Sequence, residues 1–136
     1  RQMCIRDRVQ RSKKAGLIMS VKGIRGAITV EENTASAIKD AVTELLNEMV
    51  ERNGILPENI SHAIFTLTDD LNAAFPAKFA RIDLGWENVA MMCFNELNVP
   101  GALKMCLRVL IVLNCDDSFT PEFVYLKGAS TLRSSN

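Results

Sequence analysis

Apolar stretches separated by turn residues predict five β-strands along this chain. The expected strands cover residues 21–30, residues 60–68, residues 89–94, a part of residues 103–113, and a segment that begins near Phe123. Residues 89–94 are apolar at successive positions, which is typical of a central strand buried on both faces. A polar loop over residues 114–122 separates the last two strands.

A helical periodicity fills the gap between the first two strands. Apolar pairs recur every three to four residues from Ala37 to Val50 and form one stripe that can pack on a sheet. Asn33 or Thr34 can cap the start of this helix, and Gly54 suits the left-handed position just after its end. The pattern therefore predicts a helix that ends near Asn53.

A second, shorter helix is predicted between the second and third strands. Pro76 suits its first turn, and Gly85 suits its end. The resulting order, β-α-β-α-β-β-β, favours an α/β fold with one mixed sheet, one long helix and one short helix. The long helix can cover only one face of that sheet, so we expect oligomerisation, with sites between subunits.

Arg108 interrupts one of the most apolar stretches of the chain, residues 106–113. Its guanidinium keeps its charge at physiological pH, and burial without a partner would cost several kcal/mol. The nearest acidic residue before it is Glu96, and the nearest after it is Asp116. Three interpretations stay open: a site for an anionic ligand, a structural ion pair with a carboxylate that is distant in sequence, or an arginine at the end of a strand that reaches solvent.

The composition excludes several classes of protein. The chain has 136 residues, is 48% hydrophobic and 24% charged, and so has the size and apolar content of one globular domain. Its apolar runs are shorter than the roughly 18 residues of a membrane helix, so we expect no membrane span. Beyond residue 14 the chain carries 10 basic and 15 acidic residues, which argues against a nucleic-acid partner.

The beginning of the chain differs from the rest. Residues 1–14 contain six basic residues and one acidic residue. They lack the apolar stretch of a secretory signal and show little of the amphipathic pattern of a mitochondrial presequence. The chain starts with Arg1, and Met19 precedes the first predicted strand. We therefore interpret residues 1–18 as a non-native or disordered segment and residues 19–136 as the functional domain.

The cysteines and the single histidine carry little catalytic signal. Cys4, Cys93, Cys106 and Cys115 form no C-x-x-C pair, so neither a zinc site nor a disulfide scaffold is predicted, and a reducing cytoplasm is the expected compartment. His62 lies on a predicted strand, where a packed or rim residue is more common than a catalyst. With one histidine and no G-x-S-x-G motif, a serine hydrolase is not expected.

Further cations occupy unusual positions. Arg25 lies mid-strand on a face of small residues, which leaves room for a ligand beside it. Lys78 and Arg81 are three residues apart and share one face of the short helix, although a solvated face is the usual meaning of such a pair. Arg133 closes the last apolar segment, where it could equally belong to a frayed tail.

Three more side chains could complete a site. Glu96 follows the third predicted strand, where a bend could turn it into a pocket. Cys93 has the opposite strand parity, so it shares that pocket only if the strand ends early or bulges, and otherwise it is a small buried residue. Tyr125 can place its ring in the core and its hydroxyl at the rim. Fixed cations with one carboxylate suit a small polycarboxylate and a reaction that depends on positioning and charge stabilisation.

At this point the chain resembles the monofunctional, AroH-class chorismate mutases. The matching segments run in order from Val21 to Arg133: residues 23–31, residues 70–78 with Arg81, residues 85–87, Met92-Cys93 with Glu96, residues 99–101 leading to Arg108-Val109, and residues 124–126 with Leu132-Arg133. The resemblance implies a homotrimeric pseudo-α/β barrel with active sites at subunit interfaces. It also implies the pericyclic conversion of chorismate to prephenate, without a cofactor or a covalent intermediate.

The resemblance also implies roles for individual residues. Arg108 would donate to the ether oxygen, Arg25 and Tyr125 would hold carboxylates, and Glu96 with Cys93 would contact the ring hydroxyl. The pocket wall would be formed by Phe75, Ala77, Leu132 and the backbone of Met92, Cys93, Phe94 and Asn95, and the mouth would be covered by Lys78, Arg81 and Arg133.

The chain departs from the family pattern in two places. Met92 stands where a small polar or aliphatic residue is common, and Ser134-Ser135-Asn136 replace the usual continuation after Leu132-Arg133. Two alternatives remain for a trimer of this kind. A Rid-type imine or enamine deaminase would bind a carboxylate through one arginine, and a non-catalytic binding protein would not need the set of Arg25, Glu96 and Arg108.

Overall fold

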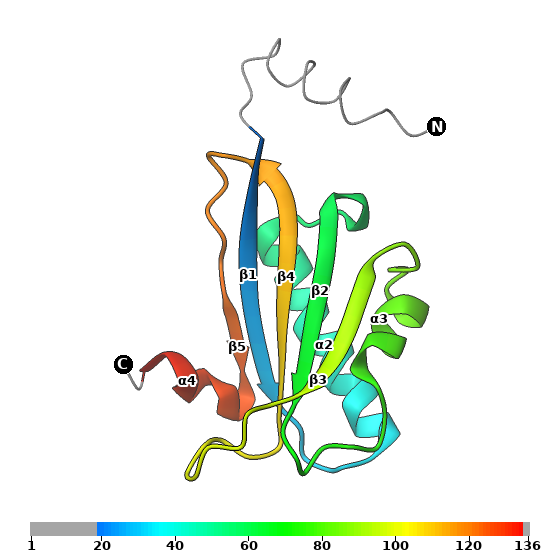
Figure 1. Cartoon of the computed structure of the whole chain (residues 1–136), viewed down its shortest axis with the longest axis vertical. Coiled ribbons are helices and arrows are strands. Elements are labelled where there is room, and N and C mark those ends of the chain that lie inside the picture. The colour runs from blue at the N-terminus through cyan, green and yellow to red at the C-terminus, as the bar shows by residue number, and fades with distance from the viewer. Residues whose placement is uncertain (1–18, 135–136) are drawn as a thin grey trace.

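A computed structural model describes residues 19–134, with side chains as far as Leu132. The chain forms one layer of five strands with its two longer helices on one face (Figure 1). The strands are β1 (Met19–Thr29), β2 (Ile60–Leu67), β3 (Ala90–Asn95), β4 (Cys106–Asp116) and β5 (Val124–Leu126). The helical elements are α2 (Ala35–Asn53), η1 (Pro57–Asn59), α3 (Pro76–Asp83), η2 (Lys127–Ser130) and α4 (Thr131–Ser134). Our interpretation of residues 1–18 lies outside the described residues.

Helix α2 forms as its capping residues predict. The hydroxyl of Thr34 accepts a hydrogen bond from the backbone N–H of Ala37 at 3.1 Å, and Gly54 ends the helix with φ 61°. That left-handed conformation costs glycine little, because it has no Cβ. At the same end, buried Asn53 donates to the carbonyl of Glu122 and accepts from its N–H. The end of α2 is thereby tied to the segment that leads into β5.

The core lies between the sheet and α2. The apolar stripe of α2 is fully buried, and its members are Ile38, Val42, Leu45, Leu46 and Met49. It packs on the inward side chains of the strands, among them Ile24, Phe65 and Ile111, while Trp86 and Phe79 extend the same core beneath α3. Burying each large apolar side chain contributes roughly 1.5–3 kcal/mol, so this interface supplies most of the hydrophobic stabilisation.

The sheet order is β3-β2-β4-β1-β5, which corrects one prediction. Strand β3 is an edge strand and not a central one. It pairs only with β2, in parallel, and its residues Ala90, Met92 and Phe94 are exposed. Its continuous apolar pattern reflects a different cause: one face packs on the core through Met91 and Cys93, while the other is apolar but uncovered in the single chain.

Strand boundaries differ from the predicted ones by a few residues. Strand β1 begins at Met19 and ends at Thr29, and β4 runs to Asp116, three residues into the predicted polar loop. The extension has a physical reason, because Met19 pairs with Asp116 across the two antiparallel strands. Backbone hydrogen bonding continues there even though the side chains have become polar.

The sheet face opposite α2 and α3, which we call the open face, is bare over most of its area. It carries Val21 and Arg25 of β1, Ile64 of β2, Met92 of β3 and Leu110 of β4; the exposed fraction is 63% for Val21 and 61% for Met92. Only one end is covered, where Ala129 and Leu132 of the C-terminal segment pack against Ala27 and Cys106. Ala27 is therefore buried, although it still borders the free space beside Arg25.

Candidate active site

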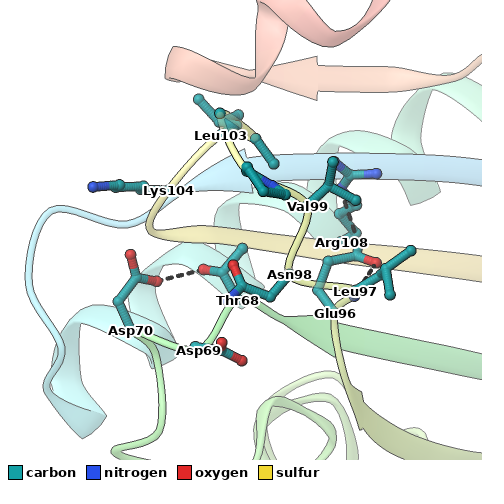
Figure 2. Close-up of a pocket in the computed structure, with 13 residues that line it drawn as sticks. Thr68, Asp69, Asp70, Glu96, Leu97, Asn98, Val99, Leu103, Lys104 and Arg108 are labelled. Atoms are coloured by element: carbon teal, nitrogen blue, oxygen red, sulfur yellow. Dashed lines mark hydrogen bonds and ion pairs between the residues drawn. The ribbon is translucent and has the colours of Figure 1, made fainter.

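The ion pair between Arg108 and Glu96 is the chemical centre of the open face. Arg108 Nε lies 3.1 Å from Glu96 Oε1, although the two residues are twelve positions apart in the chain. Strand β3 ends at Asn95, and the N–H of Glu96 donates to the carbonyl of Leu67 at 2.8 Å. After β3 the chain turns away from the direction of the strand (Figure 1). The Glu96 side chain, at this turn, points toward Arg108, as Figure 2 shows. The remote structural partner that the sequence left open is thus Glu96.

The ion pair does not satisfy Arg108 completely. Its Nε is buried, and the approach to Glu96 lacks hydrogen-bond geometry, so this N–H has no acceptor in the structure. A buried N–H without a well-aligned acceptor costs about 1–3 kcal/mol, even with a carboxylate at a short distance. A guanidinium carries five donors, so a single carboxylate leaves capacity for an anionic ligand.

Cross-strand register gathers the other predicted groups around Arg108. Tyr125 pairs with Ala27, Ala27 with Arg108, and Arg108 with Thr66, so these residues form one row across the sheet. Arg25 lies two positions along β1 on the same face. Together they border a hollow of about 260 Å³, the sheet-face hollow, lined by Arg25, Gly26, Ala27, Ile64, Thr66, Glu96, Arg108, Val109, Leu110 and Tyr125.

A second group of predicted residues lies elsewhere on the same chain. Phe75, Cys93, Phe94 and Asn95 border a hollow of about 370 Å³ at the β3 edge, which we call the edge hollow. The two hollows share no lining residue. Cys93 and Glu96 do not meet in one pocket, in agreement with their opposite parity: Cys93 packs toward the core, and Glu96 faces Arg108.

The remaining predicted residues lie beside the edge hollow or in the C-terminal segment formed by η2 and α4. Lys78 and Arg81 are exposed on α3, which follows Phe75, and the Lys78 ammonium lies 5.9 Å from the Phe79 ring. Ala77 is partly buried, and its backbone forms a hydrogen bond with the Cys93 thiol. Leu132 packs on the cluster that contains Ala27. The backbone of Arg133 lies in α4, and its side chain is outside the described part of the structure.

Burial affects the two cysteines nearest the site. It raises the pKa of the Cys93 thiol, and the hydrogen bond from Ala77 opposes that effect. Burial also raises the pKa of Cys106, where Arg108 acts in the opposite direction. Both residues therefore remain thiols at neutral pH. Thiols are weak hydrogen-bond groups and poor nucleophiles, so neither cysteine is prepared for covalent catalysis.

Several residues that contact the predicted site groups were not identified from the sequence. Thr66 Oγ1 donates to Glu96 Oε1 at 3.0 Å, and the Leu97 N–H donates to Glu96 Oε2 at 3.2 Å, so the carboxylate is held at both oxygens. Thr68 and Asp70 line a further hollow of about 610 Å³ beneath the loop of residues 97–104, the loop hollow, which also reaches Glu96 and Arg108 (Figure 2). Threonines in a strand are common, and only the fold brings Thr66 beside Glu96.

Residues 19–134 carry neither a metal-binding cluster nor a membrane-spanning helix. No cluster of three or more His, Cys, Asp or Glu side chains is placed to hold a metal ion there. Among the helices of that region, none is long and apolar enough to cross a membrane.

Comparison with known proteins gives a consistent result. Residues 21–136 match the chorismate mutase type I family. Chorismate mutase AroH of Thermus thermophilus is 48% identical over 118 residues, which cover 83% of this chain and 93% of that protein. Chorismate mutase AroH of Bacillus subtilis is 40% identical over 119 residues, which cover 85% and 91%.

A solved structure leads to the same assignment. A chorismate mutase from Clostridium thermocellum superposes with a TM-score of 0.77 at 48% identity, covering 81% of this chain and 98% of that one. The family match spans β1 and β4, which carry Arg25 and Arg108, and also Glu96 just after β3, and it confirms the family that these residues indicated. The chain belongs to the type I chorismate mutase family.

Proposed function

We infer that this protein is a chorismate mutase, an isomerase that rearranges chorismate to prephenate in the biosynthesis of aromatic amino acids. The observation that carries the mechanism is the buried Nε of Arg108, which has a carboxylate beside it but no hydrogen-bond acceptor. Family membership decides between this activity and the deaminase and non-catalytic alternatives.

Arg108 acts on the bond that breaks. In the rearrangement one C–O bond breaks while one C–C bond forms, and negative charge grows on the ether oxygen before the new carbonyl is complete. A fixed cation aimed at that oxygen stabilises the transition state more than the substrate. Glu96 holds the guanidinium in place, and it accepts a hydrogen bond from the ring hydroxyl of the substrate.

The other polar groups select the reactive conformer. Arg25 and Tyr125 border the same hollow as Arg108 and bind the substrate carboxylates. Holding both carboxylates brings the two ends of the rearranging system together, which removes part of the entropic barrier. Proton transfer has no part in this chemistry, so the arrangement needs neither a general base nor a nucleophile.

The complete site requires two chains. Arg25, Glu96, Arg108 and Tyr125 lie on the open face, whereas Phe75, Cys93 and Phe94 lie at the edge hollow, and Lys78 and Arg81 follow on α3. We propose a homotrimer in which the sheet-face hollow of one subunit meets the edge hollow of the next. The exposed apolar residues Val21 and Met92 support this arrangement, because large exposed apolar patches mark interfaces.

In the trimer, residues of the edge hollow complete the pocket. The wall is formed by Phe75, which has an exposed fraction of 74%, by Ala77, and by residues 92–95 of β3. Lys78 and Arg81 attract the dianionic substrate at the mouth, and Leu132 and Arg133 cover it. The Met92 side chain lies on the open face, where the next subunit packs in the proposed trimer. Its large size is therefore tolerated, because the substrate contacts the backbone of Met92 and not its side chain.

The compartment that we propose is the cytoplasm. The three cysteines of residues 19–134, Cys93, Cys106 and Cys115, are free thiols. Free thiols are typical of proteins in a reducing compartment.

Chorismate consumption by the purified protein tests the proposal. We expect Arg108→Ala to lower kcat by orders of magnitude, because it removes a group that acts on developing charge. Lys78→Ala should mainly raise KM, because a cation at the mouth binds substrate and transition state alike. If wild-type protein left chorismate unchanged, the function would be wrong; if both variants lost only affinity, the role of Arg108 would be wrong.

A further inference from the structure

Met105 has an unusual backbone conformation at the beginning of the strand that carries Arg108. Its φ is 49°, in the left-handed region that residues with a Cβ seldom adopt. It lies three positions before Arg108, at the junction between the loop of residues 97–104 and β4. Something in the structure must offset the cost of this conformation, which is of order 1–3 kcal/mol.

The carboxylate of Asp70 holds Met105 at this junction. The Met105 N–H donates to Asp70 Oδ1 at 3.1 Å and to Oδ2 at 3.0 Å, and the Met105 carbonyl accepts from the Val30 N–H at 2.7 Å. The N–H and the carbonyl of Met105 are therefore both hydrogen-bonded in the left-handed conformation. Asp70 belongs to the turn after β2 and lies 35 positions away in sequence.

Thr68 completes the contact. Its hydroxyl donates to Asp70 Oδ1 at 2.5 Å and accepts from the Cys106 N–H at 3.0 Å. The Thr68 N–H also donates to the Cys106 carbonyl at 3.1 Å. Consecutive peptides of the strand start, at Met105 and Cys106, are thus attached to the end of β2. The next residue on the same face as Cys106 is Arg108.

We propose that Asp70, supported by Thr68, is a positioning residue for catalysis: it holds Met105 left-handed and so sets the start of β4, from which Arg108 projects toward Glu96. This inference rests on the proposed function for the role of Arg108. We call the group of Thr68, Asp70 and Met105 the junction clamp.

The charge of Asp70 strengthens the clamp. The hydrogen bond from Thr68 lowers the pKa of Asp70, with smaller contributions from the Met105 N–H and from Lys104, while burial opposes them. The carboxylate is therefore ionised at neutral pH, and hydrogen bonds to a charged acceptor are about twice as strong as those between neutral groups.

Direct substrate binding does not explain Asp70. Asp70 and Asp69 both line the loop hollow, and carboxylates repel a dicarboxylate substrate. Asp69 is exposed at the neighbouring position, so it provides a matched control that removes the same charge and leaves the clamp intact.

Steady-state kinetics of Asp70→Ala and Asp69→Ala provide the first test. Asp70→Ala should lower kcat about tenfold with KM changed less than twofold, because misplacement of a catalytic group acts on the transition state. Asp69→Ala should leave kcat within twofold of wild type, and KM should stay the same or fall, because the variant removes a carboxylate that repels the substrate. Asp70→Asn, which keeps one acceptor oxygen and the shape, should fall between wild type and Asp70→Ala; it also serves if the alanine variant does not fold.

The second test uses Met105→Gly, since glycine adopts the left-handed conformation at little cost. In the Met105→Gly background, Asp70→Ala should lower kcat by less than threefold, whereas in the wild-type background it lowers it about tenfold. Equal losses in both backgrounds would overturn the conformational basis of the clamp. A loss that appears only in KM would overturn the positioning role.

Amide hydrogen exchange keeps this inference separate from the proposed function. The Met105 and Cys106 amides should exchange at least tenfold faster in Asp70→Ala, and should be unchanged in Asp69→Ala. Unchanged exchange in Asp70→Ala would overturn the clamp. A wild-type protein without mutase activity but with this exchange pattern would overturn the proposed function and the positioning role, while the clamp itself would stand.

Discussion

The guanidinium of Arg108 combines a positive charge, a planar shape and several donors, and these properties can be separated chemically. Replacement by citrulline keeps the shape and removes the charge. If catalysis depends on charge near the ether oxygen, citrulline should lower kcat by roughly 10²-fold or more, the scale of losing one oxyanion donor. Arg108→Lys keeps the charge without the planar fork and should recover only part of the rate. Full activity with citrulline, measured by chorismate consumption, would contradict the electrostatic mechanism.

Thr66 is a second residue whose effect can be isolated. Thr66→Val removes the hydroxyl that donates to Glu96 Oε1 at 3.0 Å and keeps the shape. A hydrogen bond to a charged group contributes about 1.5–3 kcal/mol, so we expect kcat to fall about tenfold or more. Thr66→Ser should retain the rate. Thr43→Val is the matched control, because the exposed Thr43 hydroxyl donates to the Lys39 carbonyl within the same helix, α2. Equal kinetics for the Val and Ser variants would remove Thr66 from the site.

At the scale of elements, β1 packs closely on α2 at Gly26, the residue next to Arg25. Gly26 faces α2, where an added Cβ would lie 2.9 Å from Met49 Cε and 3.3 Å from Leu45 Cδ1, and would overlap Met49 Sδ. We expect Gly26→Ala to lower the free energy of unfolding by about 1–3 kcal/mol through overpacking. In a Met49→Ala background the same change should cost less, because the overlap is gone. The measurement is denaturant unfolding. If Gly26→Ala lowered the free energy of unfolding by the same amount in both backgrounds, the contact between Gly26 and Met49 would not be tight.

For the whole molecule, the separation of the two hollows gives a quantitative prediction. The experiment mixes Arg108→Ala protein with protein that carries both Lys78→Ala and Arg81→Ala. Subunits exchange between the trimers under mild denaturant, and the rate is then measured at a low chorismate concentration. If each site combines the sheet-face hollow of one chain with the edge hollow of another, about a quarter of the sites in a random mixture receive both halves intact. A site within one chain would restore none.

The control for this experiment mixes subunits that are defective in the same half. Arg108 and Glu96 belong to one hollow, so a mixture of Arg108→Ala and Glu96→Ala subunits should regain no activity in either arrangement. Recovery in the control would point to a different division of the site. A stable, active monomer in sedimentation would contradict the trimer.

Element order and the core face of α2 follow from local periodicity, and both were predicted correctly. The caps at Thr34 and Gly54 were also predicted, because capping depends on residues close in sequence. The order of strands within the sheet was not, and β3 was wrongly assigned to the centre. A strand buried by its own chain and a strand with one apolar face left uncovered have the same composition, so their patterns cannot be distinguished.

The chemistry of the site divides in the same way. An arginine in an apolar strand indicates a partner, because an unpaired buried charge is too costly, and this argument pointed to Arg108. Arg25, Glu96 and Tyr125 were proposed from their positions near predicted strands and from the family resemblance. The sequence could not identify Glu96 as the ion-pair partner or reveal the contacts of Thr66 and Asp70. These depend on the pairing of β2 with β4 and on the bend after β3, which join residues 12 to 38 positions apart. Periodicity reports which face a side chain takes, whereas partners across strands are selected by long-range backbone pairing.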